Sequence, residues 1–170
     1  MPANQPETES VADRTASISR VMNVAAKYLF AAHASPEHLI RWFGPVGYPV
    51  TLCEQDFRVG GRFRMAMTGP DGVQGPPFGG TYLEIIPNVR IVYDNSFEDG
   101  VGGDMNLQNA GTMVMTVALA EVGDQTTLTV STLFQTIAMK DEYLGIGMLE
   151  GIASGFDHLQ VVAAELAASG

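Results

Sequence analysis

The sequence predicts an α+β fold in which an antiparallel sheet packs against a long C-terminal helix. Consecutive short segments with strand-like alternation fill the middle of the chain, and apolar residues switch to helical spacing over about the last 30 residues. A chain of 170 residues suits one domain with one core. We expect a single domain over residues 15–170, preceded by a disordered polar arm over residues 1–14.

Two short helices are predicted directly after a first strand. Roughly alternating apolar residues indicate a strand over residues 16–24, and the alanine-rich segment 25–34 favours a helix. A second helix begins at Ser35, whose side chain can cap free N–H groups. It ends at Gly44, because glycine can close a helix in the left-handed conformation.

Six further strands are separated by clusters of Gly, Pro, Asn and Asp. They are predicted at residues 49–57, 61–68, 78–86, 89–97, 110–120 and 125–134. In the second of them Phe63, Met65 and Met67 alternate with polar residues, which gives the sheet one dry face and one wet face. The segment from Glu98 to Asn109 is predicted to be a mobile acidic loop.

The last segment is predicted to be one amphipathic helix that packs on the dry face of the sheet. Its apolar stripe consists of Met148, Ile152, Phe156, Leu159, Val162 and Leu166. Gly147, Gly151 and Gly155 share one face, although each costs about 1 kcal/mol relative to alanine in a helix. Either a neighbouring backbone comes close to them, or side-chain volume is removed to make room for a ligand. The same face permits a homodimer.

Charge and composition exclude several classes of partner. The net charge of -10 disfavours nucleic acid and anionic membrane surfaces, and no apolar run reaches the roughly 18 residues of a membrane span. A lone Cys53 allows no intramolecular disulfide and suits a cytoplasmic protein. The three histidines are far apart in sequence, so we expect neither a metal site nor a cofactor.

Four motifs in order resemble those of a known family. They are SPEHLIRWFGP, DFRVGGRFRM, FGGTYLEIIPNVRIVY and MTVALAEVGDQTTLTV. In them the chain resembles the family named after the C-terminal domain of the heat shock protein 90 ATPase activator, within the START-like SRPBCC superfamily. The resemblance covers residues 16–167. It implies the helix-grip fold, in which a bent sheet wraps around the last helix and encloses a cavity.

The resemblance implies three functions. The leading hypothesis is binding of a small hydrophobic or aromatic molecule in that cavity, since the superfamily uses its scaffold for a hydrophobic pocket. The alternatives are a cyclase- or dehydratase-type enzyme acting in the cavity, and a co-chaperone-like protein interaction module with a part in stress response. The resembling heat shock co-chaperone has an additional N-terminal domain. Only about 15 residues precede the first predicted strand here, which counts against the co-chaperone hypothesis.

The chain departs from the family pattern at two places. It has Trp42-Phe43 where the family commonly has a double tryptophan, and Gly151-Ile152 where the family usually has Gly-Trp. The second change either enlarges the pocket or is compensated by Phe156.

Large apolar residues on the dry face and the last helix are the candidate ligand-binding set. They are Trp42, Phe57, Phe63, Met65, Met67, Tyr82, Tyr93, Met113, Met115, Phe134, Met148, Ile152 and Phe156. Methionine adapts to irregular apolar guests, and the two tyrosine hydroxyls can anchor a polar group. The alternative is that these residues simply fill the core. Trp42 in particular shares a helical face with Leu39 and Phe43, which predicts a structural role first and a pocket role second.

The enzyme alternative needs a group for general acid or base catalysis. The candidates are Asp56, Glu84, Tyr82 and Tyr93. The interpretation favoured for both carboxylates is a charge on the sheet surface or an acceptor in a turn.

Overall fold

The computed structural model describes residues 9–44, 47–96 and 111–169. The strands are β1 (Thr15–Met22), β2 (Val50–Gln55), β3 (Arg62–Met67), β4 (Phe78–Ile86), β5 (Arg90–Asp94), β6 (Met113–Val122) and β7 (Gln125–Phe134). The helices are α1 (Ala26–His33), α2 (Pro36–Trp42), α3 (Ile137–Gly145) and α4 (Met148–Ser169). The predicted strands are all found, with ends shifted by a few residues.

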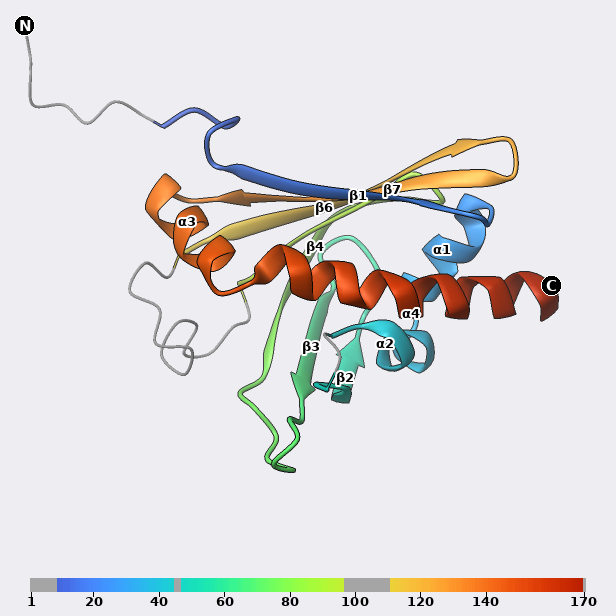
Figure 1. Ribbon diagram of the computed structural model, residues 1–170, viewed down its shortest axis with the longest axis horizontal. Coiled ribbons are helices and arrows are strands. Elements are labelled where there is room, and N and C mark those ends of the chain that lie inside the picture. The colour runs from blue at the N-terminus through green and yellow to red at the C-terminus, as the bar shows by residue number, and fades with distance from the viewer. Residues whose placement is uncertain (1–8, 45–46, 97–110, 170) are drawn as a thin grey trace, which may run out of the picture.

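The strands form one antiparallel sheet in the order β1-β7-β6-β5-β4-β3-β2 (Figure 1). β1 and β2 therefore lie at opposite edges of the sheet, and the connection between them contains α1 and α2. β1 pairs with the last strand, while β2 to β7 are neighbours in sequence order. The predicted α+β class, with a curved antiparallel sheet and a long C-terminal helix, is confirmed.

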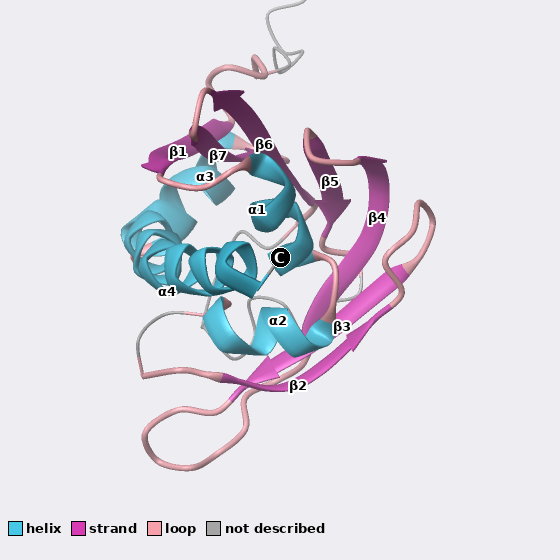
Figure 2. Ribbon diagram, turned by 90° about the vertical axis from the view of Figure 1, so that its right-hand side faces the viewer, coloured by secondary structure: helices cyan, strands magenta, loops and turns pink. Residues whose placement is uncertain are grey.

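The sheet bends strongly along β4 (Figure 2). This strand pairs with β3 on one side and β5 on the other. A Cβ atom at Gly79 would lie 1.9 Å from the carbonyl oxygen of Phe63, and one at Gly80 would lie 1.7 Å from that of Asp94. Because only glycine permits such close approach, this pair lets the neighbouring strands follow the bend.

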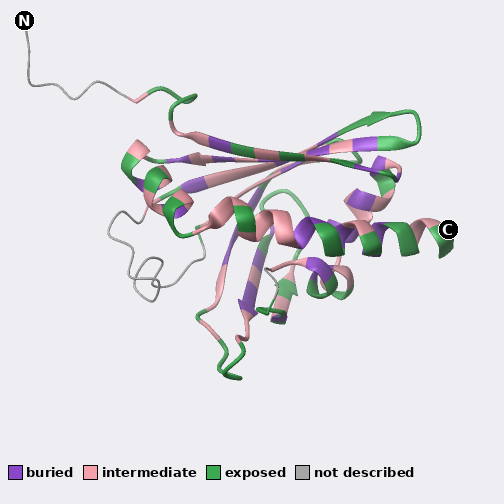
Figure 3. Cartoon of the chain, in the orientation of Figure 1, coloured by how far each residue is buried: buried purple, intermediate pink, exposed green. Residues whose placement is uncertain are grey.

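The helices lie inside the curve of the sheet, where α4 contacts both α1 and α2 (Figure 2). Buried and exposed residues alternate along α4, as an amphipathic helix requires (Figure 3). Phe156, Leu159 and Val162 of the predicted stripe are buried in the main core. Met148 and Ile152, nearer the start of the helix, are only partly buried.

The predicted long C-terminal helix is found as α4, but its predicted extent over about the last 30 residues is wrong at the start, where a separate helix, α3, and a break precede it. α3 begins after Thr136, whose side-chain oxygen accepts a hydrogen bond from the Met139 backbone N–H (3.1 Å). The break before α4 contains Gly147 with φ of 89°. This left-handed conformation ends one helix and redirects the chain before the next.

The three glycines that were predicted to share a helical face have different roles. Gly147 lies in the break and not in α4. At Gly155 a Cβ atom would lie 3.3 Å from the carbonyl oxygen of Trp42, so this glycine brings α4 close to the end of α2. All three glycines line a cavity. Close packing and open space therefore both occur, and Gly155 takes part in both.

The predicted cap of α2 by Ser35 is also wrong. Ser35 occupies the N-cap position with extended backbone, but its side chain makes no capping bond. Pro36 follows and has no N–H, which reduces the number of donors that need a partner. At the other end of the helix, Gly44 has φ of 101°, as its predicted role requires.

The predicted arm and loop lie largely outside the described residues, which begin at residue 9 and omit the segment from Glu98 to Asn109. Residues 9–14 contact the start of α3, since the Glu9 carboxylate accepts from the Ile137 N–H (2.8 Å). Within the described part of the chain, no helix combines the length and apolar composition needed to cross a membrane.

Candidate ligand-binding cavity

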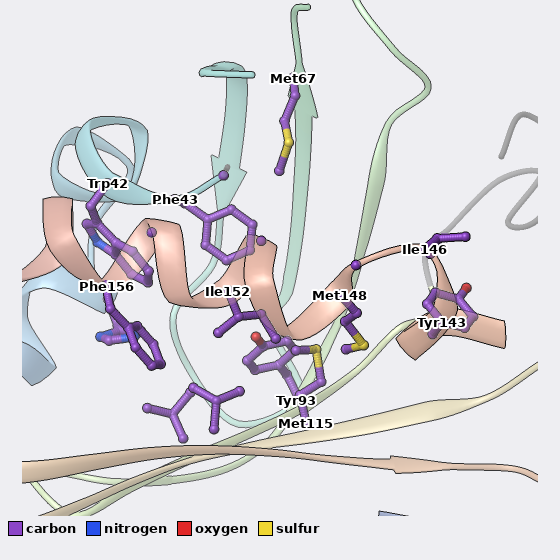
Figure 4. Close-up of a pocket in the computed structure, with 17 residues that line it drawn as sticks. Trp42, Phe43, Met67, Tyr93, Met115, Tyr143, Ile146, Met148, Ile152 and Phe156 are labelled. Carbon is purple, nitrogen blue, oxygen red and sulfur yellow. The ribbon is translucent and has the colours of Figure 1, made fainter. Parts of the chain in front are cut away.

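A cavity of about 310 Å³ lies between α4 and the concave face of the sheet. We call it the α4 cavity. Its walls come from all four helices, from the break between α3 and α4, and from strands β3, β5, β6 and β7. Trp42 and Phe156 lie at one end, and Tyr143 and Ile146 at the other (Figure 4).

The two ends of the α4 cavity differ in exposure. Trp42, Phe156 and His33 are buried and form its deep end. Ile146, in the break between α3 and α4, is 52% exposed and lies at the mouth. The more exposed end of the cavity therefore lies near the start of α4.

Trp42 ties two helices together at the deep end. Its indole Nε1 donates a hydrogen bond to the carbonyl oxygen of Ala32 in α1 (2.8 Å). The indole also packs edge to face against the His33 imidazole, with ring centroids 4.7 Å apart. The structural role predicted for Trp42 agrees with these contacts, and the same side chain forms part of the cavity wall.

The walls of the α4 cavity are apolar and uncharged. No Asp, Glu, Lys or Arg side chain is among the described residues that line it. Met67, Met115 and Met148 contribute three flexible side chains from three different elements. An ion in this space would lose its water without gaining a charged partner, which costs several kcal/mol at least. The described walls therefore suit a neutral, apolar guest.

His33 is neutral in the folded chain. Burial lowers the pKa of its imidazole from 6.5 to about 4, because water no longer stabilises the charged form, and the bond to the Leu29 carbonyl opposes this shift only in part. Nδ1 lies 2.7 Å from that carbonyl oxygen, one turn back in α1.

A second, smaller void of about 30 Å³ lies beneath β3, β4 and β5. Four of the predicted ligand-binding residues line it rather than the α4 cavity, and these are Phe57, Phe63, Met65 and Tyr82. The Tyr82 ring packs against Phe57 and Phe63, each with centroids 5.1 Å apart. The space holds about one water molecule, so these four side chains pack as core.

Tyr82, a candidate for catalysis, is a buried neutral phenol. Its hydroxyl accepts a hydrogen bond from Gln55 Nε2 (2.8 Å), which also donates to the His33 carbonyl (2.8 Å). Burial raises the pKa of Tyr82 to about 12. Tyr93, the other tyrosine candidate, lines both spaces.

Met113 and Phe134 lie in a separate apolar cluster. They pack with Ala16, Met139 and Tyr143 under α3. Neither lines the α4 cavity.

The two carboxylates considered for catalysis are at the surface. Asp56 forms an ion pair with Arg58 (2.8 Å), and Glu84 forms one with Arg90. Neither lines the α4 cavity. Among the described residues no three His, Cys, Asp or Glu side chains come together as a metal site would require.

The family model described as Activator of Hsp90 ATPase homolog 1-like protein matches residues 23–164. The chain belongs to this family. All described residues that line the α4 cavity fall within the matched segment. A search of curated proteins finds no significant match.

Solved structures of bacterial proteins share the fold of this Activator of Hsp90 ATPase homolog 1-like chain. One from Nitrosomonas europaea has 22% identity and a TM-score of 0.80, with 92% of this chain and 98% of that chain covered. One from Arthrobacter aurescens has 26% identity and a TM-score of 0.79, with 92% and 90% covered. An AHSA1-like protein from Aeromonas hydrophila has 18% identity and a TM-score of 0.65, with 90% and 94% covered.

Seven residues of the predicted ligand-binding set line the α4 cavity of this family member: Trp42, Met67, Tyr93, Met115, Met148, Ile152 and Phe156. Lining side chains that the prediction missed are His33, Phe43, Val117, Val130, Tyr143 and Ile146. Val117 and Val130 continue the alternation of their strands and are direct cross-strand partners, so the signal for them was present. Tyr143 and Ile146 were missed because α3 was not predicted.

Ile152 stands where the family pattern usually has tryptophan, and it lines the α4 cavity. Phe156, one turn later, is buried at the deep end. Both side chains line the same cavity.

Proposed function

We propose that the chain binds a small, neutral, hydrophobic molecule in the α4 cavity. The observation that carries this proposal is a space of about 310 Å³ whose described walls contain no ionised side chain. Ligand sites in proteins are mostly apolar and of about 300–1,000 Å³, so this cavity suits a guest at the small end of that range.

Apolar burial supplies the binding free energy. Each Å² of apolar surface removed from water contributes about 25 cal/mol. Met67, Met115 and Met148 line the cavity from different elements, and their unbranched side chains adapt to guests of different shape. The family fold supports a binding role. The chemistry of the residues that line the cavity indicates which kind of guest fits.

A fluorescence titration with N-phenyl-1-naphthylamine, a neutral apolar dye that brightens in apolar surroundings, tests the proposal. The full chain is compared with Ile152→Trp, which places an indole in the α4 cavity. The family pattern usually has tryptophan at this position, so we expect this variant to fold. The matched control is Val161→Trp on the exposed side of the same helix, where Val161 is 56% exposed.

We expect saturable binding to the unaltered chain and to Val161→Trp, and a loss of affinity of at least about tenfold in Ile152→Trp. Equal affinity in all three proteins would show that the dye binds elsewhere. Absence of binding to every member of a panel of neutral apolar compounds would overturn the proposal.

The cyclase or dehydratase and the protein interaction module remain hypotheses, and no particular contact favours either over ligand binding. The homodimer also remains a prediction, which light scattering tests.

A further inference from the structure

The hydrogen-bonding state of His33 follows from its contact with Leu29. Nδ1 lies 2.7 Å from the Leu29 carbonyl oxygen, and a carbonyl oxygen can only accept a hydrogen bond. Nδ1 therefore carries the proton of the neutral imidazole. The other ring nitrogen, Nε2, then has a free lone pair and can only accept.

Nε2 has no hydrogen-bond partner among the described residues. Some polar side-chain atoms, such as Gln55 Oε1 and His38 Nδ1, are fully enclosed by the protein and have no partner. His33 Nε2 is not one of these enclosed atoms. His33 is only 8% exposed and lines the α4 cavity. Nε2 therefore retains some accessible surface, and the spaces that His33 lines are the α4 cavity and the void of about 30 Å³. Of these two, the α4 cavity is the one with room for more than about one water molecule, and an unmet buried acceptor is costly there.

Three contacts hold the His33 residue in place. The ring is fixed by the bond from Nδ1 to Leu29 and by the edge-to-face contact with Trp42. The backbone carbonyl accepts a hydrogen bond from Gln55 Nε2. A fixed acceptor inside an apolar cavity is the kind of single polar group that orients a ligand.

We propose that His33 Nε2 selects ligands that carry a neutral hydrogen-bond donor, as an apolar alcohol or phenol does. This inference rests on the proposed function. The donor end lies at the deep end beside Trp42, and the apolar body extends toward Met148 and the mouth. Carboxylates are disfavoured, because an ionised carboxylate has no proton to donate and finds no cation in the described walls.

A matched pair of probes tests this selection. 2-Naphthol and 2-methylnaphthalene have nearly the same shape, are both uncharged at pH 7, and differ in the hydroxyl donor. Their dissociation constants are measured by displacement of N-phenyl-1-naphthylamine from the unaltered chain and from His33→Leu, which removes the acceptor. His158→Leu is the control, since it makes the same substitution at an exposed histidine of α4 that does not line the cavity.

We expect the preference for 2-naphthol over 2-methylnaphthalene to fall about fivefold to tenfold in His33→Leu, as the loss of one hydrogen bond predicts. The preference should stay unchanged in His158→Leu. Binding of both probes with the same preference in all three proteins would overturn the inference and leave the proposed function standing. Binding of neither probe, nor of any other neutral apolar compound, would overturn both.

A second measurement does not depend on the folding of His33→Leu. The ¹⁵N resonance of His33 Nε2 is recorded in the unaltered chain with each probe. Acceptance of a hydrogen bond moves the resonance of an unprotonated imidazole nitrogen to lower frequency, so 2-naphthol should shift it and 2-methylnaphthalene should not. Equal shifts with both probes, or no shift with 2-naphthol bound, would contradict the proposed contact.

Discussion

Trp42 Nε1 donates a hydrogen bond of 2.8 Å to the carbonyl oxygen of Ala32, and this bond fixes α2 against the end of α1. Both groups are buried, so the bond satisfies a donor and an acceptor that water cannot reach. The indole also forms part of the wall at the deep end of the α4 cavity. The shape of that end therefore depends on a hydrogen bond from a side chain of α2 to the backbone of α1.

Trp42→Phe should lower the free energy of unfolding by about 2 kcal/mol. The variant loses the hydrogen bond, leaves the Ala32 carbonyl without its partner and removes part of a buried ring. Urea denaturation measures the change. Tyr48→Phe is the control, because Tyr48 is 48% exposed, and it should change stability by less than about 0.5 kcal/mol. Equal effects of the two substitutions would contradict the role given to Trp42.

Gly80→Ala should destabilise the sheet by about 3 kcal/mol or more. The added methyl group would meet the Asp94 carbonyl oxygen at 1.7 Å, so β4 and β5 would have to separate. Gly75→Ala provides a comparison, because its methyl group would lie at an ordinary 3.5 Å from the Met67 carbonyl oxygen. Thermal unfolding of both variants checks the difference, and a melting temperature of Gly80→Ala close to that of the unaltered chain would exclude the proposed close approach.

The stability of the fold should depend on pH through His33. Its folded pKa of about 4 lies below the ordinary value of 6.5, so the unfolded chain binds more protons between these two pH values. Stability from this group is fully present above about pH 6.5 and is lost as the pH falls toward 4, by about 3 kcal/mol in total. No ionised side chain among the described residues that line the α4 cavity faces the ring to offset this loss.

Urea denaturation at pH 7 and at pH 4.5, with the unaltered chain and with His33→Leu, isolates this contribution from the titration of the carboxylates. The unaltered chain should lose about 2–3 kcal/mol more than the variant. The same loss in both proteins would show that His33 is not buried as described.

Asp56→Asn and Glu84→Gln should leave ligand binding unchanged. Both carboxylates pair with arginines at the surface and lie away from the α4 cavity. Exposed ion pairs contribute up to about 1 kcal/mol, so stability should change little as well. The dissociation constant of N-phenyl-1-naphthylamine provides the test, and a change of more than about threefold for either variant would place its carboxylate closer to the guest than the structure does.

Local patterns were sufficient to predict the strands, the two short helices and the amphipathic character of the last segment. The alternation of Phe63, Met65 and Met67 is a property of the strand itself. The break at Gly147 was missed, because the apolar spacing continues on both sides of it while its left-handed conformation is visible only in the backbone.

The cavity could be predicted only in part. Met113 and Met115 alternate in phase on β6 and face the same side of the sheet, yet α3 covers the first and leaves the second open to the α4 cavity. Alternation determines which face a side chain occupies, whereas the tertiary position of a helix determines whether space remains above it. His33 was considered only as a metal ligand, since its role depends on a contact with Trp42 that the sequence does not show.

The most direct test of the central claim is a set of isotope-filtered nuclear Overhauser effects between a bound neutral probe, such as 2-naphthol, and the methionine methyl groups. We predict contacts from the probe to the methyl groups of Met67, Met115 and Met148, which line the α4 cavity. Met113, buried in the separate cluster under α3, should show none. The account would be contradicted by contacts from the probe to Met113 or to surface side chains together with no contact to the methyl groups of Met67, Met115 and Met148.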